Sequence, residues 1–123
     1  MEKWIVPCNV KYYDVNNAFN KLKKLDWKQS CKSINIGDEV YIYVGKPYSA
    51  IKYRCVVNKV NIESIEIDDS EFVIDGSPYE NYHNYMELEL LEVFADDELT
   101  IDVLRDRGLK GNIQSPRCAS NLL

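Results

Sequence analysis

The clearest alternation of apolar and polar positions lies in residues 40–44, where three aliphatic residues alternate with Tyr41 and Tyr43. A β-strand with this pattern places its aliphatic side chains on one face and its tyrosines on the other. The Gly37-Asp38 pair before it favours a turn, because glycine tolerates tight backbone conformations and aspartate can hydrogen-bond its own turn. We predict that the aliphatic row is core and that the tyrosine row belongs to a second core layer or to a pocket wall.

Four other segments have the patterns of strands. They are residues 3–7, residues 50–62, residues 65–74 and residues 86–93. Pro7 is expected to end the first of them, because proline cannot donate a hydrogen bond to a ladder. The third is expected to be a strand or a hairpin that is broken near residues 68–69. Residues 75–78, with the sequence Asp-Gly-Ser-Pro, predict a turn before the last strand.

Two segments have helical periodicity, and a third has a helix-start signal. Asp14 suits an N-cap, and the apolar residues after it recur at spacings of three and four: Val15, Ala18, Phe19, Leu22 and Leu25. This helix is expected to end in a polar loop, residues 26–30, that carries Trp27. Residues 99–107 predict a second helix with acids at its start and Gly108 as its stop. Pro116 predicts a last helix over residues 117–123.

The strands outnumber the helices and are mostly joined by short turns. We therefore predict an α+β fold with five or six mainly antiparallel strands, curved into a barrel or strongly bent sheet, and two or three helices. With 123 residues, 46% of them apolar, the chain can form one domain, residues 1–123, with its own core. No apolar run approaches the roughly 20 residues that span a bilayer. The first residues lack the pattern of a secretion signal, so a cytoplasmic location is expected.

Charge is distributed unevenly along the chain, although the net charge is only −5. Residues 60–104 carry fourteen acids and no Lys or Arg, which gives −14, and the remaining residues carry six acids and fifteen bases, which gives +9. The sum is −5. One side of an acidic protein can therefore bind nucleic acid. The simpler interpretation, a solvated acidic face against an ordinary basic one, stays open.

Catalytic and metal-binding signals are weak. The four cysteines lie far apart, without a Cys-x-x-Cys pair, and His83 is the single histidine, so we predict free thiols, no metal site and no cofactor. His83 has no serine or cysteine arranged around it in a known local pattern, and no phosphate-binding glycine loop is present. This chain by itself is not expected to be an enzyme.

Aromatic residues in predicted loops are the stronger functional signal, and they are Trp27, Tyr48, Tyr79 and Tyr82. A flipped base is held against flat apolar faces and is read at its polar edge by amides and hydroxyls. Predicted loops supply such groups at Asn9, Gln29, Ser30, Asn112 and Gln114. The alternative is that the aromatic residues simply pack the core. It explains Trp4 as well as a ligand contact does, and it explains Trp27 less well.

The order of these features resembles the EVE domain of the PUA-like superfamily over nearly the whole chain, with a layout also similar to YTH domains. The features are residues 4–7 (Trp-Ile-Val-Pro), the helix from Asp14, Trp27 after it, residues 37–43, residues 51–57 and residues 108–117. The resemblance implies a PUA-like pseudo-barrel with a pocket for a modified base. Methylated or hydroxymethylated cytosine and methylated adenine are the expected ligands, with DNA favoured over RNA.

The resemblance also implies roles for particular residues. Trp27 would form one wall of an aromatic cage, Tyr79 or Tyr82 would form the facing wall, and Asn9 and Ser30 would be polar readers. Gln114 and Arg117 would approach the pocket rim or the nucleic-acid backbone. Neutralisation of phosphates would fall to five basic residues: Lys28, Lys32, Lys46, Lys52 and Arg117. Residues 28–31 read Lys-Gln-Ser-Cys where the family usually has Gly-Val-Arg-Asn, which leaves the identity of the base open.

Two hypotheses follow for function. The first is a reader of modified bases, either standing alone or as the N-terminal part of a longer modification-dependent restriction protein with a fused or associated nuclease. The second is a protein-interaction or small-ligand module that uses the acidic face, residues 60–104. Basic residues gathered around Trp27 would favour the first hypothesis, and scattered ones the second.

Overall fold

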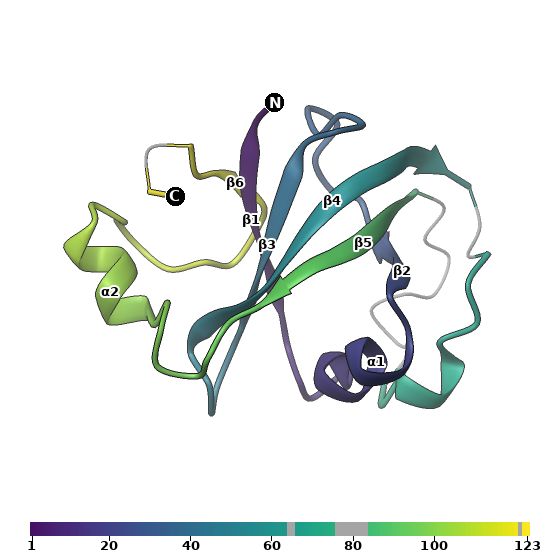
Figure 1. The fold of residues 1–123 in the computed structure, drawn as a ribbon, viewed down its shortest axis with the longest axis horizontal. Coiled ribbons are helices and arrows are strands. Elements are labelled where there is room, and N and C mark those ends of the chain that lie inside the picture. Colours follow the sequence, from purple (N-terminus) through teal and green to yellow (C-terminus); the bar gives the residue numbers. More distant parts are fainter. Residues whose placement is uncertain (64–65, 76–83, 121) are drawn as a thin grey trace.

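A computed structural model describes residues 1–63, 66–75, 84–120 and 122–123. Its centre is a six-stranded mixed sheet with the strand order β2-β5-β4-β3-β1-β6 (Figure 1). The strands are β1 (Lys3–Cys8), β2 (Lys24–Lys28), β3 (Glu39–Val44), β4 (Ala50–Ile62), β5 (Tyr85–Val93) and β6 (Arg117–Cys118). Two α-helices, α1 (Val15–Lys21) and α2 (Ile101–Asp106), and a short 3-10 helix, η1 (Ser70–Phe72), complete the described elements. The predicted α+β class with mainly antiparallel strands is therefore confirmed.

The one parallel pairing in the described sheet joins β1 to β3, with Trp4 opposite Val40 and Cys8 opposite Val44. The other neighbouring pairs are antiparallel. Pro7 does not end β1 as predicted, because the pairing continues through Pro7 to Cys8. Since β1 and β3 run in the same direction, their carboxyl ends meet at one edge of the sheet.

The sheet separates two hydrophobic clusters, as the alternation in β3 predicted. Val40, Ile42 and Val44 belong to the cluster that includes α1, and Tyr41 belongs to the cluster beneath α2 and the C-terminal segment. Tyr41 stacks on Phe94 at 6.3 Å between ring centroids. The prediction of two core layers on either side of β3 is confirmed.

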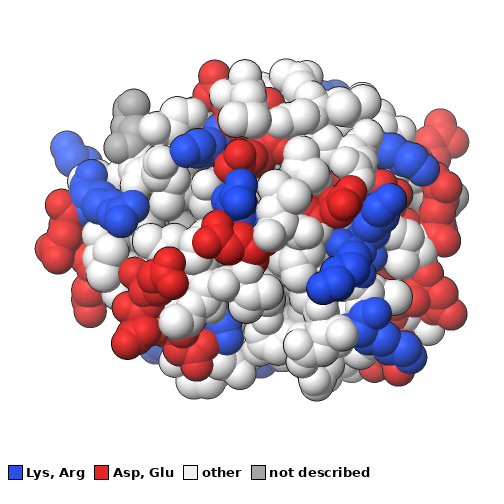
Figure 2. Space-filling view, in the orientation of Figure 1, with Lys and Arg blue, Asp and Glu red and all other residues white. Residues whose placement is uncertain are grey.

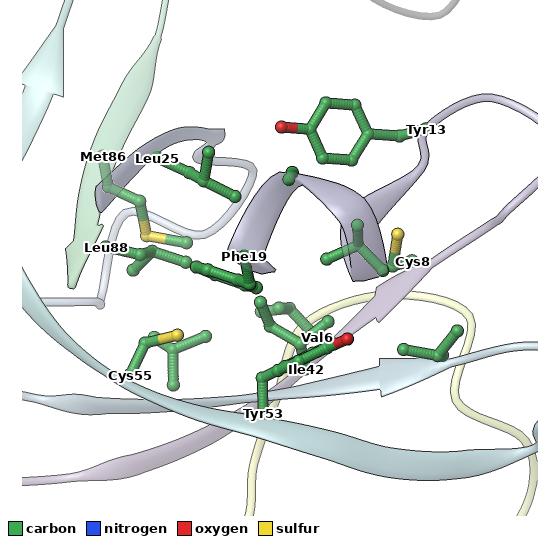
Figure 3. Close-up of a cluster of buried hydrophobic side chains, with 14 of the residues drawn as sticks. Val6, Cys8, Tyr13, Phe19, Leu25, Ile42, Tyr53, Cys55, Met86 and Leu88 are labelled. Atoms are coloured by element: carbon green, nitrogen blue, oxygen red, sulfur yellow. The ribbon is translucent and has the colours of Figure 1, made fainter. Parts of the chain in front are cut away.

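Helix α1 packs on the first face of the sheet through Phe19, which Figure 3 shows beside Ile42, Tyr53 and Leu88. The ring centroids of Phe19 and Tyr53 lie 4.9 Å apart. Asp14 caps the helix as predicted, with its side chain accepting a hydrogen bond from the Asn17 amide at 3.3 Å.

The predicted extension of this helix to Leu25 is wrong, because α1 ends at Lys21 and Leu25 lies in β2. The backbone of Leu22 is already extended, with φ −116° and ψ 137°. Residues 24–28 then pair with β5, which places Trp27 opposite Met86 rather than in a polar loop. Pairing with the edge of β5 outweighs the local helical pattern, since tertiary contacts routinely override propensity.

Three further boundaries differ from the predictions. The described part of residues 65–74 contains η1 instead of a strand, with Val73 only bridged to Tyr13. Helix α2 starts later than predicted, because Thr100 rather than the acids before it provides the N-cap. The predicted last helix is absent from the described C-terminal residues, where β6 pairs with the outer edge of β1 and so satisfies its backbone groups. Gly108 follows α2 with φ +114°, as expected of a helix stop.

Charged side chains of both signs are interspersed on the face displayed in Figure 2. Several acids of residues 60–104 pair with bases from elsewhere in the chain, including Glu71 with Lys21 and Glu92 with Arg54. These ion pairs locally offset the charge separation that exists along the sequence. None of the described helices is long and apolar enough to cross a membrane.

Candidate functional site

A cavity of about 840 Å³ opens where the carboxyl ends of β1 and β3 meet. Its walls come from β2, from the turn between β1 and α1, from the start of β5 and from the loop that joins α2 to β6. Tyr43, the second tyrosine of the alternating row, lines it together with Cys8 and Gly45. The predicted pocket wall from the tyrosine row is thus present at Tyr43.

Trp27 and Tyr13 belong to the aromatic part of the lining, which also includes Tyr12, Tyr43 and Tyr85. The ring centroids of Trp27 and Tyr13 are 5.8 Å apart and the ring planes meet at 84°, so the edge of one ring faces the other. Trp27 is half-buried and packs against the first hydrophobic cluster. Because the two rings are perpendicular, they offer a flat ligand one stacking platform rather than two parallel plates. The facing wall was predicted at Tyr79 or Tyr82, which lie outside the described residues.

Two buried carboxylates, Asp26 and Asp69, also line the cavity. Asp26 Oδ2 accepts hydrogen bonds from the backbone amides of Glu66 at 2.7 Å and Ile67 at 2.8 Å. Asp69 Oδ2 accepts one from the Tyr13 hydroxyl at 2.6 Å. Burial raises the pKa of Asp69 above its ordinary value, and the nearby Asp26 adds to this, although the Tyr13 hydrogen bond opposes it. The lining therefore combines acceptor groups with an aromatic face.

Polar and basic side chains complete the lining. Asn9, Ser30 and Gln114 are exposed residues at the cavity, each predicted as a reader. Asn9 also shapes its own turn, since its Oδ1 accepts the Lys11 amide at 2.9 Å. The basic residues of the lining come from three different elements, and they are Lys11, Lys28 and Lys46.

Four predicted site residues are placed elsewhere. Gln29 is buried, and its side chain joins the Cys31 carbonyl to the Asn61 amide, so it holds the backbone around the site. Lys52 pairs with Asp96 and lies over the Tyr48 ring. Lys32 and Arg117 do not line the cavity, and Arg117 Nη1 instead donates to the Lys110 carbonyl at 2.9 Å.

The structure adds cavity residues that the sequence did not single out, chiefly Tyr13, Asp26, Asp69 and Lys11. A weak signal existed for Asp26, because it stands between the apolar residues Leu25 and Trp27. No comparable signal marked Asp69. It reaches the site through the segment around η1, whose path depends on tertiary contacts.

Thiol and metal chemistry receive little support at this cavity. Burial raises the pKa of the Cys8 thiol to about 12, so this lining residue is a weak nucleophile at neutral pH. Cys8, Cys31, Cys55 and Cys118 are free. Within the described ranges, no three His, Cys, Asp or Glu side chains cluster in a way that could hold a metal ion.

Comparisons with known proteins define the fold. No family model matches the chain, and no curated protein matches it. The solved structure of ASCH from Zymomonas mobilis is similar, with a TM-score of 0.62 over 95% of this chain and 87% of that one at 9% identity. A tyrosine-to-phenylalanine mutant of the Zymomonas mobilis protein gives 0.65 over 96% and 90% at 8% identity. The chain therefore shares its PUA-like pseudo-barrel fold with these ASCH structures. The predicted resemblance to the EVE domain itself is not confirmed.

Proposed function

We propose that this protein binds nucleic acid and accepts one unstacked base in the cavity, against Trp27. The observation that carries the proposal is the placement of a half-buried tryptophan in a cavity that also gathers three lysines. A volume of about 840 Å³ lies within the range of roughly 300–1,000 Å³ that is usual for ligand pockets. The cavity has room for a base and for part of its sugar-phosphate backbone.

The lysines support binding of a polyanion. Lys11, Lys28 and Lys46 come from the turn after β1, from β2 and from the loop after β3, yet they line the same cavity. Contacts between lysines and phosphates supply most of the affinity of proteins for nucleic acids and orient the strand. Of the five predicted phosphate contacts, Lys28 and Lys46 are at the cavity, and Lys32, Lys52 and Arg117 are not.

A modified base is the ligand that we propose within this class, in DNA in preference to RNA. Support comes from the apolar part of the lining, where Val6, Val73 and Pro116 accompany Trp27. A methyl group on the base would bury its surface against such side chains, which favours binding by about 0.8 kcal/mol for each buried carbon. The resemblance to base-reading PUA-like domains points in the same direction. Such a reader would serve as the specificity domain of a modification-dependent restriction system.

The test is a titration of short single-stranded and duplex oligonucleotides, DNA and RNA, that differ only in one methyl or hydroxymethyl group. Trp27→Ala should weaken binding by about 1–3 kcal/mol, or roughly 5- to 150-fold, because base-aromatic stacking is lost. Trp27→Phe should lose less. Unfolding by urea should show that both variants remain folded.

Lysine variants provide the matched control. Lys46→Gln should weaken the binding of modified and plain oligonucleotides alike. It should also reduce the slope of log affinity against log salt concentration by about one unit. Lys23→Gln removes the same charge from an exposed position outside the cavity and should change neither quantity. Equal affinity for all strands, unaltered by Trp27→Ala, would overturn the proposal and favour a protein or small-molecule ligand.

A further inference from the structure

One oxygen of Asp26 stands out among the polar atoms of the cavity lining. The residue is 7% exposed, and its Oδ2 accepts two backbone hydrogen bonds. Its Oδ1 is buried and has no hydrogen-bond partner among the described residues. Leaving a buried acceptor unsatisfied costs about 1–3 kcal/mol, and more for a charged group. An unsatisfied buried acceptor calls for an explanation, and because Asp26 lines the cavity, a donor on a bound ligand is one that this site can supply.

No donor among the described residues makes a hydrogen bond to this oxygen. The Tyr13 hydroxyl donates to Asp69 rather than to Asp26. The amides of Glu66 and Ile67 both donate to Oδ2. These two bonds also fix the carboxylate, so Asp26 is an acceptor that is held in place in the cavity lining.

We propose that Asp26 Oδ1 accepts a hydrogen bond from the exocyclic amino group of the bound base, so that the cavity selects bases that carry an amino group. This inference rests on the proposed function, and it names the chemical class that the cavity prefers. Cytosine presents an amino donor at the position where uracil and thymine present a carbonyl oxygen, and adenine presents one where guanine has a carbonyl oxygen. A carbonyl oxygen there would face the carboxylate oxygen and leave both acceptors unpaired.

The same geometry sets a rule for methylated amino groups. A singly methylated amino group keeps one N–H and can still donate to Asp26, while its methyl group can contact the apolar lining. A doubly methylated amino group has no N–H and cannot donate. Binding should therefore weaken when the second methyl group is added to the amino group, and not when the first is added.

The experiment compares four DNA oligonucleotides that differ at one base: cytosine, N4-methylcytosine, N4,N4-dimethylcytosine and uracil. The wild-type protein should bind the first two about tenfold more tightly than the last two, as expected for one hydrogen bond to a carboxylate. Asp26→Asn keeps an oxygen for the two backbone amides and turns the other position into a donor. This variant should bind uracil more tightly than cytosine.

Reversal of the preference separates base reading from a structural role, because a merely destabilised protein would lose affinity for all four strands. Asp97→Asn makes the same chemical change at an exposed position outside the cavity and should leave the preference unaltered. Trp27-dependent binding of all four strands with equal affinity, in the wild type and in Asp26→Asn, would overturn this inference and leave the proposed function standing. No binding to any strand would overturn both.

Discussion

At the scale of single residues, Asp38 organises the start of the sheet. Its Oδ1 accepts the Glu2 amide, and its Oδ2 accepts the Trp4 indole N–H and the Asn35 amide, all at 3.0 Å. Burial opposes the charge of Asp38, but these three hydrogen bonds lower the pKa of its carboxyl group. Asp38 thus fixes the beginning of β1 against the turn before β3, which makes Trp4 a core residue and not a ligand platform.

Asp38→Asn should reduce the free energy of unfolding at pH 7 by about 1–3 kcal/mol, because an amide cannot accept hydrogen bonds at both positions. A lowered pKa in the folded state gives stability that is present above the ordinary aspartate pKa, about 3.9, and that is lost as the pH falls through the folded-state pKa. The difference between the variant and the wild type should therefore shrink below about pH 4. Urea unfolding between pH 3 and pH 7 measures it.

The pKa of Asp69 is shifted in the direction opposite to that of Asp38. Its pKa is raised by burial, so ionising it costs stability as the pH rises above its ordinary value. The stability of Asp69→Asn relative to the wild type should increase between pH 3 and pH 7, whereas that of Asp38→Asn should decrease. Parallel curves for the two variants would contradict both assignments.

Single residues also show what the sequence could and could not predict about the site. Trp27, Asn9, Ser30, Gln114, Lys28 and Lys46 were predicted as site residues, and all six line one cavity. Their roles as ligand contacts stay predictions. Gln29 and Ser30 were equally good candidates for a polar contact in the sequence, but the Gln29 side chain makes hydrogen bonds to the backbone. The bond with the Asn61 amide joins residues 32 positions apart, and no local pattern reveals it.

At the scale of elements, α1 is only seven residues long and depends on its packing against the sheet. An isolated helix of this length is not stable in water. Phe19 is the largest of its buried side chains, and its ring packs against Tyr53.

Phe19→Ala should lower the free energy of unfolding by roughly 3–5 kcal/mol, because it leaves a cavity between α1 and the sheet. Asn20→Ala, on the exposed side of the same helix, should change it by less than about 0.5 kcal/mol. Thermal and urea unfolding of both variants measure the difference. A cost below about 1 kcal/mol for Phe19→Ala would show that this contact does not hold α1 in place.

Element boundaries were predicted well where one pattern acts alone and poorly where two compete. The bounds of β4, Ala50–Ile62, were predicted to the residue, since more buried and less buried positions alternate clearly along this strand. Leu22 and Leu25 continue the helical spacing of α1, and yet residues 24–28 pair with β5. The two-residue strand β6 is too short to show a periodicity. It forms by pairing with the edge of β1 that β3 leaves free.

At the scale of the whole molecule, the fold class was predictable because the strand patterns are numerous and the turns are short. The parallel pairing of β1 with β3 was not, since it depends on a connection of about thirty residues between them. The predicted separation of charge also changes in three dimensions. Residues 60–104 return to the sheet through β5, where their acids meet Arg54 and Lys59 of β4.

The two ends of the chain lie close together, on the same side of the molecule (Figure 1). The Ala119 amide donates to the Lys3 carbonyl at 2.7 Å, and Lys3 Nζ donates to the Leu123 carbonyl at 2.8 Å. Among the described residues of the two ends, 1–5, 118–120 and 122–123, none lines the cavity. The connection between the ends is therefore structurally independent of the candidate site.

Circular permutation follows from this arrangement. A short Gly-Ser linker can join the ends, and new ends can be cut between Asp97 and Glu98, in the exposed turn before α2. The permuted protein should fold with the same sheet, which near- and far-ultraviolet circular dichroism can check, and its affinity for oligonucleotides should stay within about threefold of the wild type. The adjacent ends also make this domain suitable for insertion as one unit into a loop of a host enzyme. In such a chimera, occupancy of the cavity would stiffen the inserted domain and could be read out as host activity.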